Sequence, residues 1–237
     1  MTSVEFTSEI TVKLVDVMGD DLTIARAAWV STKGERAEDE ADPARVRGLI
    51  NYLMRHRHGT PFEHNAMTLL VKAPIFVFRE WHRHRVAWSY NEVSGRYSKL
   101  EPLFYLPPWD RPLVNAGSSA HPDMVPGDDK QHDLVTKLLE DNAKAAYKRY
   151  SELLEAGVAN EVARMVLPLN VFTSMYASCN VRSLMHFLSL RTDHPEARYP
   201  SKPMWEIAVA AEAAETFFAE HFPISYQAYV ANGRTAP

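Results

Sequence analysis

The sequence predicts an α+β fold with an antiparallel sheet, flanking long helices and a helical C-terminal half. Residues 10–18 alternate between β-branched or apolar side chains and polar ones, as a strand with one buried face does. From about Asp129, apolar residues recur at helical spacing instead. Because strands come early and helices late, without regular alternation, a parallel α/β fold is disfavoured. We therefore expect one domain that spans residues 1–237.

The first half of the chain is expected to contribute two strands and three helices. The clearest helix start is Asp42-Pro43, because Asp is a favoured N-cap and Pro a favoured first helical residue. In chain order the predicted elements are a strand at 10–18, a helix at 22–30, a helix from 43 to about 59, a strand at 66–72 and a helix at 74–86.

The second half begins with a long irregular connection. Six prolines lie between Pro102 and Pro126, and proline interrupts both helices and sheets. The long helix that follows is expected to end at Gly157 and to bury a face made of Leu134, Leu138, Ala145 and Leu153. Further helices are predicted at about 162–166, at 183–190 and from Pro203 onward.

Composition and charge disfavour several classes of protein. Hydrophobic residues make up 46% and charged residues 24% of the 237 residues, as in soluble globular chains. The net charge of −4 disfavours a protein that wraps a nucleic-acid backbone. No apolar run is long enough to span a membrane, the N-terminus lacks a secretory pattern, and the single cysteine cannot form a disulfide within the chain. We expect a cytoplasmic protein that binds neither membranes nor nucleic acids.

One segment combines cations, small polar groups and aromatic rings. Five basic side chains lie between Arg79 and Lys99, and Arg83, His84 and Arg85 are consecutive. On the expected helix these three residues would fan about 100° apart, which suits a ligand gripped from several sides. The planar fork of arginine matches phosphate. The segment also supplies Ser89, Asn91, Glu92, Ser94 and Gly95.

Two other interpretations compete with an anion-binding site. A run of charges is most often a solvated helix face, but here Trp81, Trp88, Tyr90 and Tyr97 are interleaved with the charges. A basic strip with aromatic residues can also bind single-stranded nucleic acid. The acidic net charge disfavours that reading, so the segment predicts a focused site for a small anion such as a nucleotide.

The same residues resemble the signature of a known family. Arg83-His84-Arg85, followed at a short distance by Ser94, resembles the signature of flavin-dependent thymidylate synthases, in which seven residues precede the serine. Further segments resemble other motifs of that family in the right order: 58–64, 162–168, 180–184 and 188–191. Several ordered motifs are far stronger support than one short pattern.

The resemblance implies an enzyme that methylates dUMP to dTMP. Methylene-tetrahydrofolate would donate the carbon, NADPH would be the reductant, and bound FAD would carry the hydride. Members of the family work as homotetramers in which several subunits build each active site. For this chain we therefore expect FAD as cofactor, dUMP and folate as small-molecule partners, and a homotetramer.

The resemblance also assigns roles to individual residues. Contacts with FAD are implied for Thr60, Arg83, His84, Arg85, Glu92, Asn180, Arg182 and His186. Contacts with dUMP are implied for Glu80, Arg83, Glu92, Ser94, Gly95, Arg96, Arg164 and Arg191. Arg191 is the implied catalytic residue, because a preplaced guanidinium beside uracil favours the form that is ionised at N3. Arg96 and Arg164 suit the phosphate.

Three positions depart from the family pattern. Eight residues (86–93) precede the signature serine instead of seven, and we assign the extra one to Ala87 or Trp88. An insertion rotates a helix by about 100°, so it must be absorbed as a π-bulge or a wider turn. Glu80 stands where relatives can carry Gln, so we expect it at the base or sugar rather than the phosphate. His186 stands where some members have Asn.

Other reactive side chains favour plainer roles. Cys179 lies among small and apolar neighbours, which favours a buried, inert thiol over a nucleophile. No base is placed to activate Ser94. Two histidine pairs at i, i+2 lack the spacing of a structural zinc site, so no metal is expected. His58 and Tyr97 are candidates for the folate entrance.

A second function class remains open. A protein of the same fold could keep the nucleotide grip but lose turnover through the altered signature. This non-catalytic alternative predicts binding of dUMP without formation of dTMP. Nucleic-acid binding is a third alternative, and a strong salt-dependent affinity for DNA would support it.

Overall fold

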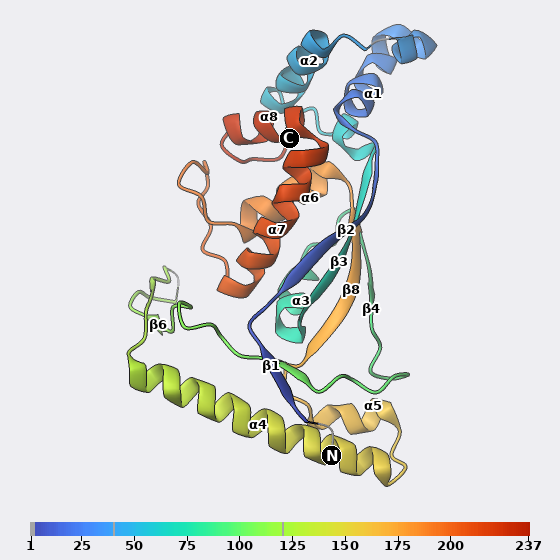
Figure 1. Ribbon diagram of the computed structural model, residues 1–237. Helices are drawn as coiled ribbons and strands as arrows, with labels where there is room; N and C mark the ends of the chain where they lie inside the picture. Colours follow the sequence, from blue (N-terminus) through green and yellow to red (C-terminus); the bar gives the residue numbers. More distant parts are fainter. Residues whose placement is uncertain (1–2, 40, 120) are drawn as a thin grey trace. The chain divides into compact units, whose positions relative to one another are not determined.

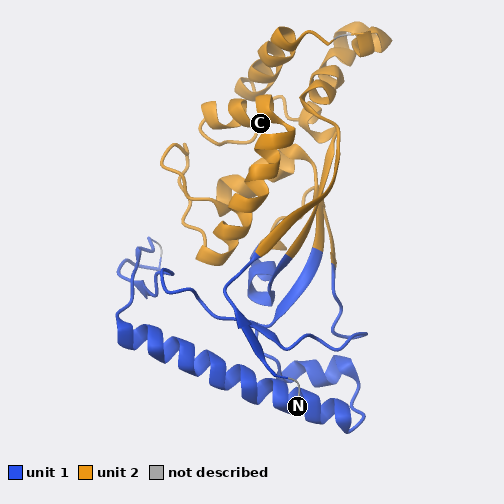
Figure 2. Cartoon of the chain, in the orientation of Figure 1, with its two compact units in different colours: residues 1–10, 72–80, 92–175 blue, residues 11–71, 81–91, 176–237 orange. Residues whose placement is uncertain are grey.

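The structure is a computed structural model that describes residues 3–39, 41–119 and 121–237. The chain forms two compact units, each assembled from three separate stretches (Figure 2). Unit 1 comprises residues 1–10, 72–80 and 92–175, and unit 2 comprises residues 11–71, 81–91 and 176–237. The predicted α+β class is confirmed, with an antiparallel sheet and a helical C-terminal half.

The largest sheet has four strands in the order β2, β3, β8, β4. Their bounds are Thr11–Met18 for β2, Ala66–Pro74 for β3, Phe172–Cys179 for β8 and Trp88–Glu92 for β4. Strands β2 and β3 confirm the two strands predicted from periodicity. Strands β4 and β8 were not predicted, and β3 and β8 each contribute residues to both units.

In unit 2, long helices accompany the sheet. Helix α6 (Val181–Arg191) packs against α7 (Trp205–His221), and α7 packs against β2 (Figure 1). The helix predicted from Pro203 onward is in fact two helices, because α8 (Pro223–Ala231) follows α7 at a break. The remaining elements of the unit are α1 (Asp21–Lys33), a 3-10 helix η1 (Gly34–Asp39), α2 (Pro43–Arg55) and η2 (Thr60–Glu63).

Helix α2 begins as predicted and ends earlier than predicted. The Asp42 side chain accepts a hydrogen bond from the N–H of Ala44 at 2.9 Å, which confirms its role as N-cap. The helix ends at Arg55 rather than near Gly59, because Arg57 adopts a left-handed φ of +59°. The chain therefore turns before the segment 58–64.

Unit 1 is built around one long helix and short strands. Strand β1 (Glu5–Thr7) pairs in parallel with β5 (Leu103–Tyr105), and β6 (Val114–Asn115) pairs antiparallel with β7 (Met124–Val125). Strands β5, β6 and β7 lie within the irregular connection that the prolines predict. The helices of the unit are α4 (Asp129–Glu155), α5 (Asn160–Ala163) and the 3-10 helix η3 (Arg164–Val166).

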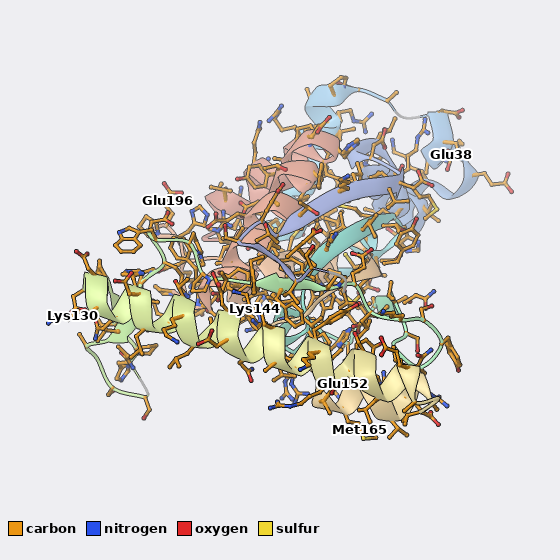
Figure 3. The ribbon with its side chains drawn as sticks, turned by 60° about the horizontal axis from the view of Figure 1, so that its bottom comes forward. Glu38, Lys130, Lys144, Glu152, Met165 and Glu196 are labelled. Atoms are coloured by element: carbon orange, nitrogen blue, oxygen red, sulfur yellow. The ribbon has the colours of Figure 1, made fainter. Side chains whose placement is uncertain are left out.

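The buried face of α4 differs from the predicted one. Leu134 and Leu138 are more than half exposed, whereas Tyr147 and Tyr150 are buried against Phe104 and neighbouring apolar residues. Figure 3 shows the outer side of this helix, where Lys144 and Glu152 are labelled. The prediction was wrong for the two leucines, which share the apolar spacing but lie on the exposed side, whereas the predicted Leu153 packs against the core together with the alanines and tyrosines of the buried face.

Candidate functional site

Unit 2 contains a pocket of about 450 Å³, a size typical of sites for small ligands. Residues 83–88 form one wall, and Arg182, Ser183 and His186 of α6 form another, with Glu63 of η2 beside them. Five residues with implied FAD contacts therefore line a single pocket, although they come from two motifs about a hundred positions apart in the sequence: Arg83, His84, Arg85, Arg182 and His186.

The first wall is a turn and not a helix. Helix α3 (Ile75–Trp81) ends five positions before the predicted Val86, so the Arg-His-Arg stretch does not fan around a helix. Ala87 has a φ of +51°, which non-glycine residues rarely adopt, and it leads directly into β4. The chain thus passes the position of the extra residue as a turn, one of the two ways in which an insertion can be absorbed.

Hydrogen bonds hold this turn in place from both sides. The Tyr90 hydroxyl, on β4, donates to the main-chain oxygen of His84. The Ser183 hydroxyl, on α6, donates to the main-chain oxygen of Val86 at 2.9 Å. Two carbonyl groups of the turn are therefore satisfied by side chains of neighbouring elements, and the wall is preformed.

The start of helix α6 is fixed in a similar way. The Asn180 side chain is the N-cap and accepts a hydrogen bond from the N–H of Ser183 at 2.9 Å. Asn65 accepts from the N–H of Val181 at 2.8 Å. These bonds place Arg182, in the first turn of α6, at the pocket wall, next to the positive end of the helix dipole.

Arg191, the implied catalytic residue, contacts the pocket wall through His84. Its Nε donates a hydrogen bond to Nε2 of His84 at 3.0 Å. Burial is the largest cause that lowers the pKa of His84 to about 4, and the charges of Arg191 and His186 contribute to the same shift. The imidazole is therefore neutral at physiological pH, with its proton on Nδ1, because Nε2 must be free to accept.

The pocket carries an excess of positive charge. Arg83, Arg85 and Arg182 supply three guanidinium groups against the one carboxylate of Glu63. Burial also lowers the pKa of His186, so this ring does not add charge at neutral pH. Trp88 contributes aromatic surface to the same wall. These groups suit a ligand that combines an anionic group with a flat ring.

The second group of site residues lies in unit 1. It contains most of the residues with implied dUMP contacts, namely Glu80, Glu92, Ser94, Gly95, Arg96 and Arg164. Gly95 is buried, and a Cβ at this position would lie 3.2 Å from Cδ of Arg164, so glycine permits the close approach. Nε of Arg96 pairs with Oε2 of Glu161 at 2.9 Å.

Glu92 has an unusual environment for a carboxylate. Desolvation by burial raises its pKa, while the Thr173 hydroxyl and the Arg164 charge act in the opposite direction. A carboxyl group with a raised pKa can remain protonated more readily and donate a hydrogen bond to a ligand. Glu92 thus differs from an ordinary solvated glutamate.

Some of the predicted FAD contacts lie outside the pocket lining, and some neighbouring residues were not predicted. Thr60 is exposed at the start of η2, and Asn180 caps α6 without lining the pocket. Three neighbouring residues were not singled out from the sequence. Two of them, Glu63 and Ser183, line the pocket, and the third, Glu161, forms an ion pair with Arg96. Glu63 and Ser183 lie inside the quoted motifs, so their neighbourhood was the signal that could have found them.

Cys179 is buried, as predicted, and burial raises the pKa of its thiol. A protonated, buried thiol is a poor nucleophile. Within the described residues, no helix is long and apolar enough to cross a membrane.

Comparison with known proteins identifies close relatives. The chain matches the family model described as thymidylate synthase complementing protein over residues 13–224. A flavin-dependent thymidylate synthase from Streptomyces coelicolor is 54% identical over 236 residues, covering 99% of this chain and 96% of the relative. The enzyme of that description from Thermotoga neapolitana is 48% identical over 219 residues, covering 92% of this chain and 90% of the relative.

Solved structures agree in fold. The UMP/dUMP methylase PolB from Streptomyces cacaoi, crystallised with 5-Br dUMP, aligns with a TM-score of 0.93 and 46% identity over 99% of this chain and 100% of that chain. A second PolB structure, with 5-Br UMP, aligns with a TM-score of 0.91 and 43% identity over 99% of each chain. Sequence and fold agree over nearly the full length, and the chain therefore belongs to the family of flavin-dependent thymidylate synthases.

Proposed function

We propose that this protein methylates C5 of dUMP to give dTMP, using methylene-tetrahydrofolate as the carbon donor and NADPH as the reductant through bound FAD. The observation that carries the proposal is the pocket of unit 2, which gathers five predicted cofactor contacts from two separate motifs. The names of relatives at up to 54% identity support the same chemistry. When bound, the flavin would supply hydride transfer.

The cofactor roles follow from the pocket. Arg83, Arg85 and Arg182 would bind anionic groups of FAD, and His84 and His186 would contact it as neutral rings. Further predicted contacts come from Thr60, Glu92 and Asn180. The donor set fits such a group, because guanidinium forks match phosphate oxygens in geometry.

The nucleotide roles follow from Arg191 and unit 1. The Arg191 guanidinium would stabilise the anion left when uracil N3 loses its proton, which makes the ring a better nucleophile toward the methylene donor. His84 would orient that guanidinium by accepting from its Nε. The phosphate would bind Arg96 and Arg164, with Arg83, Glu80, Glu92, Ser94 and Gly95 as the other predicted contacts.

The direct test is turnover that depends on every component. Purified protein should show a flavin spectrum after incubation with FAD, and NADPH oxidation should require dUMP and folate together. Release of tritium from [5-³H]dUMP should disappear in Arg191→Ala. Binding of dUMP without tritium release from the unaltered protein would instead favour the non-catalytic alternative.

The choice between deoxyribose and ribose substrates needs its own measurement. PolB, which aligns over nearly the whole chain, is described as acting on both UMP and dUMP. We expect dUMP to be the preferred substrate here, because the curated relatives are thymidylate synthases. Measuring kcat/KM for both nucleotides at equal ionic strength checks this, and a preference for UMP would reassign the substrate.

We also propose that the protein is a homotetramer with active sites built from several subunits. Membership of the family supports this, because the resemblance implies homotetramers with shared active sites. Most of the predicted cofactor contacts lie in unit 2, and most of the predicted nucleotide contacts lie in unit 1. Mixing inactive Arg182→Ala with inactive Arg96→Ala, after subunit exchange, should restore part of the activity. No recovery in verified mixed oligomers would contradict shared sites.

A further inference from the structure

The Arg182 guanidinium lies directly on the backbone of Gly59. A Cβ at position 59 would overlap with Cζ and Nε of Arg182 and would lie 2.8 Å from its Nη2. Gly59 itself has φ −77° and ψ −31°, a helical conformation that any residue adopts. Glycine is therefore not required here by the backbone, and the space of its missing side chain is filled by the guanidinium.

Two further groups hold the same guanidinium. Nη1 of Arg182 donates to Oε1 of Glu63 at 2.5 Å, and Nε donates to the main-chain oxygen of Pro237 at 2.9 Å. A guanidinium has five N–H groups. The two bonds use two of them, so three N–H groups are left for a ligand of the pocket that Arg182 lines.

This arrangement contributes little to folding. The side chains of Arg182 and Glu63 are 35% and 40% exposed, and an exposed ion pair adds little to the free energy of unfolding. A long arginine side chain also loses considerable rotamer freedom when it is fixed. Fixing it is useful if a ligand binds afterwards, because the entropy cost is then no longer part of binding.

We propose that Gly59 and Glu63 are positioning residues that hold the Arg182 guanidinium ready for an anionic group of the ligand in this pocket. The inference rests on the proposed function in that the ligand is taken to be FAD, whose diphosphate is the anion. Gly59 acts by lacking a side chain, Glu63 by orienting one edge of the fork, and neither touches the cofactor in this role.

The test is a double-mutant cycle on cofactor affinity. Gly59→Ala displaces the end of a flexible side chain, so the fold should persist while the Kd for FAD rises about tenfold, the loss expected for one charged hydrogen bond. Arg182→Ala should raise the Kd at least as much. In the Arg182→Ala background, Gly59→Ala should then change the Kd for FAD by less than about twofold, because the guanidinium that it would displace is absent.

Matched variants separate positioning from general damage. Gly48→Ala is the control, since its Cβ would meet no atom within 4 Å, and it should leave the Kd for FAD unchanged. Glu63→Gln keeps an acceptor oxygen and should bind FAD better than Glu63→Ala. Equal, additive effects of Gly59→Ala with and without Arg182 would overturn the proposal.

A readout without cofactor distinguishes this inference from the proposed function. Crystal structures of the unaltered protein and of Gly59→Ala, both free of FAD, should show the guanidinium on Gly59 in the first and displaced in the second. If the Arg182 guanidinium of the unaltered protein lies away from Gly59, the inference is wrong, even if FAD binds. An unaltered protein with the guanidinium in place but no affinity for FAD contradicts only the proposed function.

Discussion

The hydrogen bond from Arg191 to His84 restricts the protonation state of the histidine. Nε2 of His84 can accept from the guanidinium only if it carries no proton. Burial, Arg191 and the neighbouring His186 all favour the neutral ring. A residue of the cofactor pocket thus orients the residue that is proposed to activate uracil.

His84 should remain neutral far below the pH at which an ordinary histidine gains its proton. Its pKa is lowered to about 4, so its ring signals should not titrate between pH 7 and 5. Because the unfolded chain binds this proton near pH 6.5, the contribution of His84 to stability is complete above that pH and is lost as the pH falls toward 4. NMR titration of the imidazole Cε1–H measures the pKa, and urea unfolding at a series of pH values measures the change in stability.

Arg191→Ala provides the matched comparison for that titration. Removing the guanidinium should raise the pKa of His84, since its charge is the second largest cause of the shift. The pKa should still stay below 6.5, because burial is the largest cause and persists. A His84 pKa that is unchanged by Arg191→Ala would contradict the contact.

The ion pair between Arg96 and Glu161 should affect how tightly the phosphate of dUMP binds. Both side chains are about half exposed, so their ion pair adds less than about 1 kcal/mol to the free energy of unfolding. Arg96→Ala should therefore leave stability nearly unchanged but weaken dUMP binding by about 10- to 100-fold, as for a lost charged hydrogen bond. Glu161→Gln should strengthen binding, because the carboxylate competes with phosphate for Arg96. Calorimetric titration measures both effects, and deoxyuridine, which lacks the phosphate, should respond to neither change.

At the scale of elements, the turn before β4 is where the chain departs most from the sequence-based expectation. Nothing at 82–87 is a glycine or a proline, so the helix was expected to continue to Val86. Instead, Ala87 takes a left-handed φ, and side chains from β4 and α6 hold the turn. Tertiary hydrogen bonds overcome the local preference of the sequence.

Ala87→Gly should stabilise the protein. A left-handed φ strains a residue that has a Cβ, and relief of that strain exceeds the added freedom of glycine in the unfolded chain, so the free energy of unfolding should rise by up to about 1 kcal/mol. Ala145→Gly in the interior of α4 is the matched control and should lower the free energy of unfolding by roughly 1 kcal/mol. Urea unfolding measures both, and a loss of stability in Ala87→Gly would argue against the left-handed turn.

The two missed strands of the four-stranded sheet, β4 and β8, show the limit of periodicity as a predictor. In β8 one face carries the buried residues Thr173, Met175, Ala177 and Cys179, while the other face carries the buried Phe172 and the exposed Tyr176. Apolar residues therefore occur on both faces, and no alternation of hydrophobicity is visible. Strand β2, with a clear alternation, was predicted to within a residue.

The site was predictable wherever a motif had a recognisable residue type. Arg83, His84 and Arg85 were singled out because charged groups interleaved with aromatic residues are unusual, whereas Arg182 and His186 were assigned only through the family resemblance. Gly59, Glu63 and Glu161 were not assigned roles, because their contacts join residues far apart in the sequence. An ion pair between positions 63 and 182 leaves no local pattern.

At the scale of the molecule, a buried charged network attaches the last residues to unit 2. Arg234 is 3% exposed, and its Nη2 donates to Glu215 at 2.7 Å and to Thr192 at 3.1 Å. The hydroxyl of Tyr226 donates to the same carboxylate. Every charge of this network is thus compensated within one unit, and residues 235–237 continue directly from it.

Arg234→Met should destabilise the protein strongly, by about 3–5 kcal/mol, because it leaves the Glu215 carboxylate buried without its partner. Arg234→Met combined with Glu215→Met should recover most of the loss, since two apolar side chains replace a pair whose desolvation cost is large. Both variants keep the left-handed φ of +54° at position 234, so backbone strain is matched. Urea unfolding without cofactor measures the cycle, and equal stability of the two variants would contradict this account.

The same two variants should also change the affinity of the pocket for FAD. The main-chain oxygen of Pro237 accepts from Nε of Arg182, so freeing the segment that begins at Arg234 should also remove one restraint on that guanidinium. Arg234→Met should then raise the Kd for FAD under conditions where the protein remains folded, and the double variant should restore affinity together with stability. If affinity stays low after stability returns, Arg234 affects the pocket by a route other than its charge pair with Glu215.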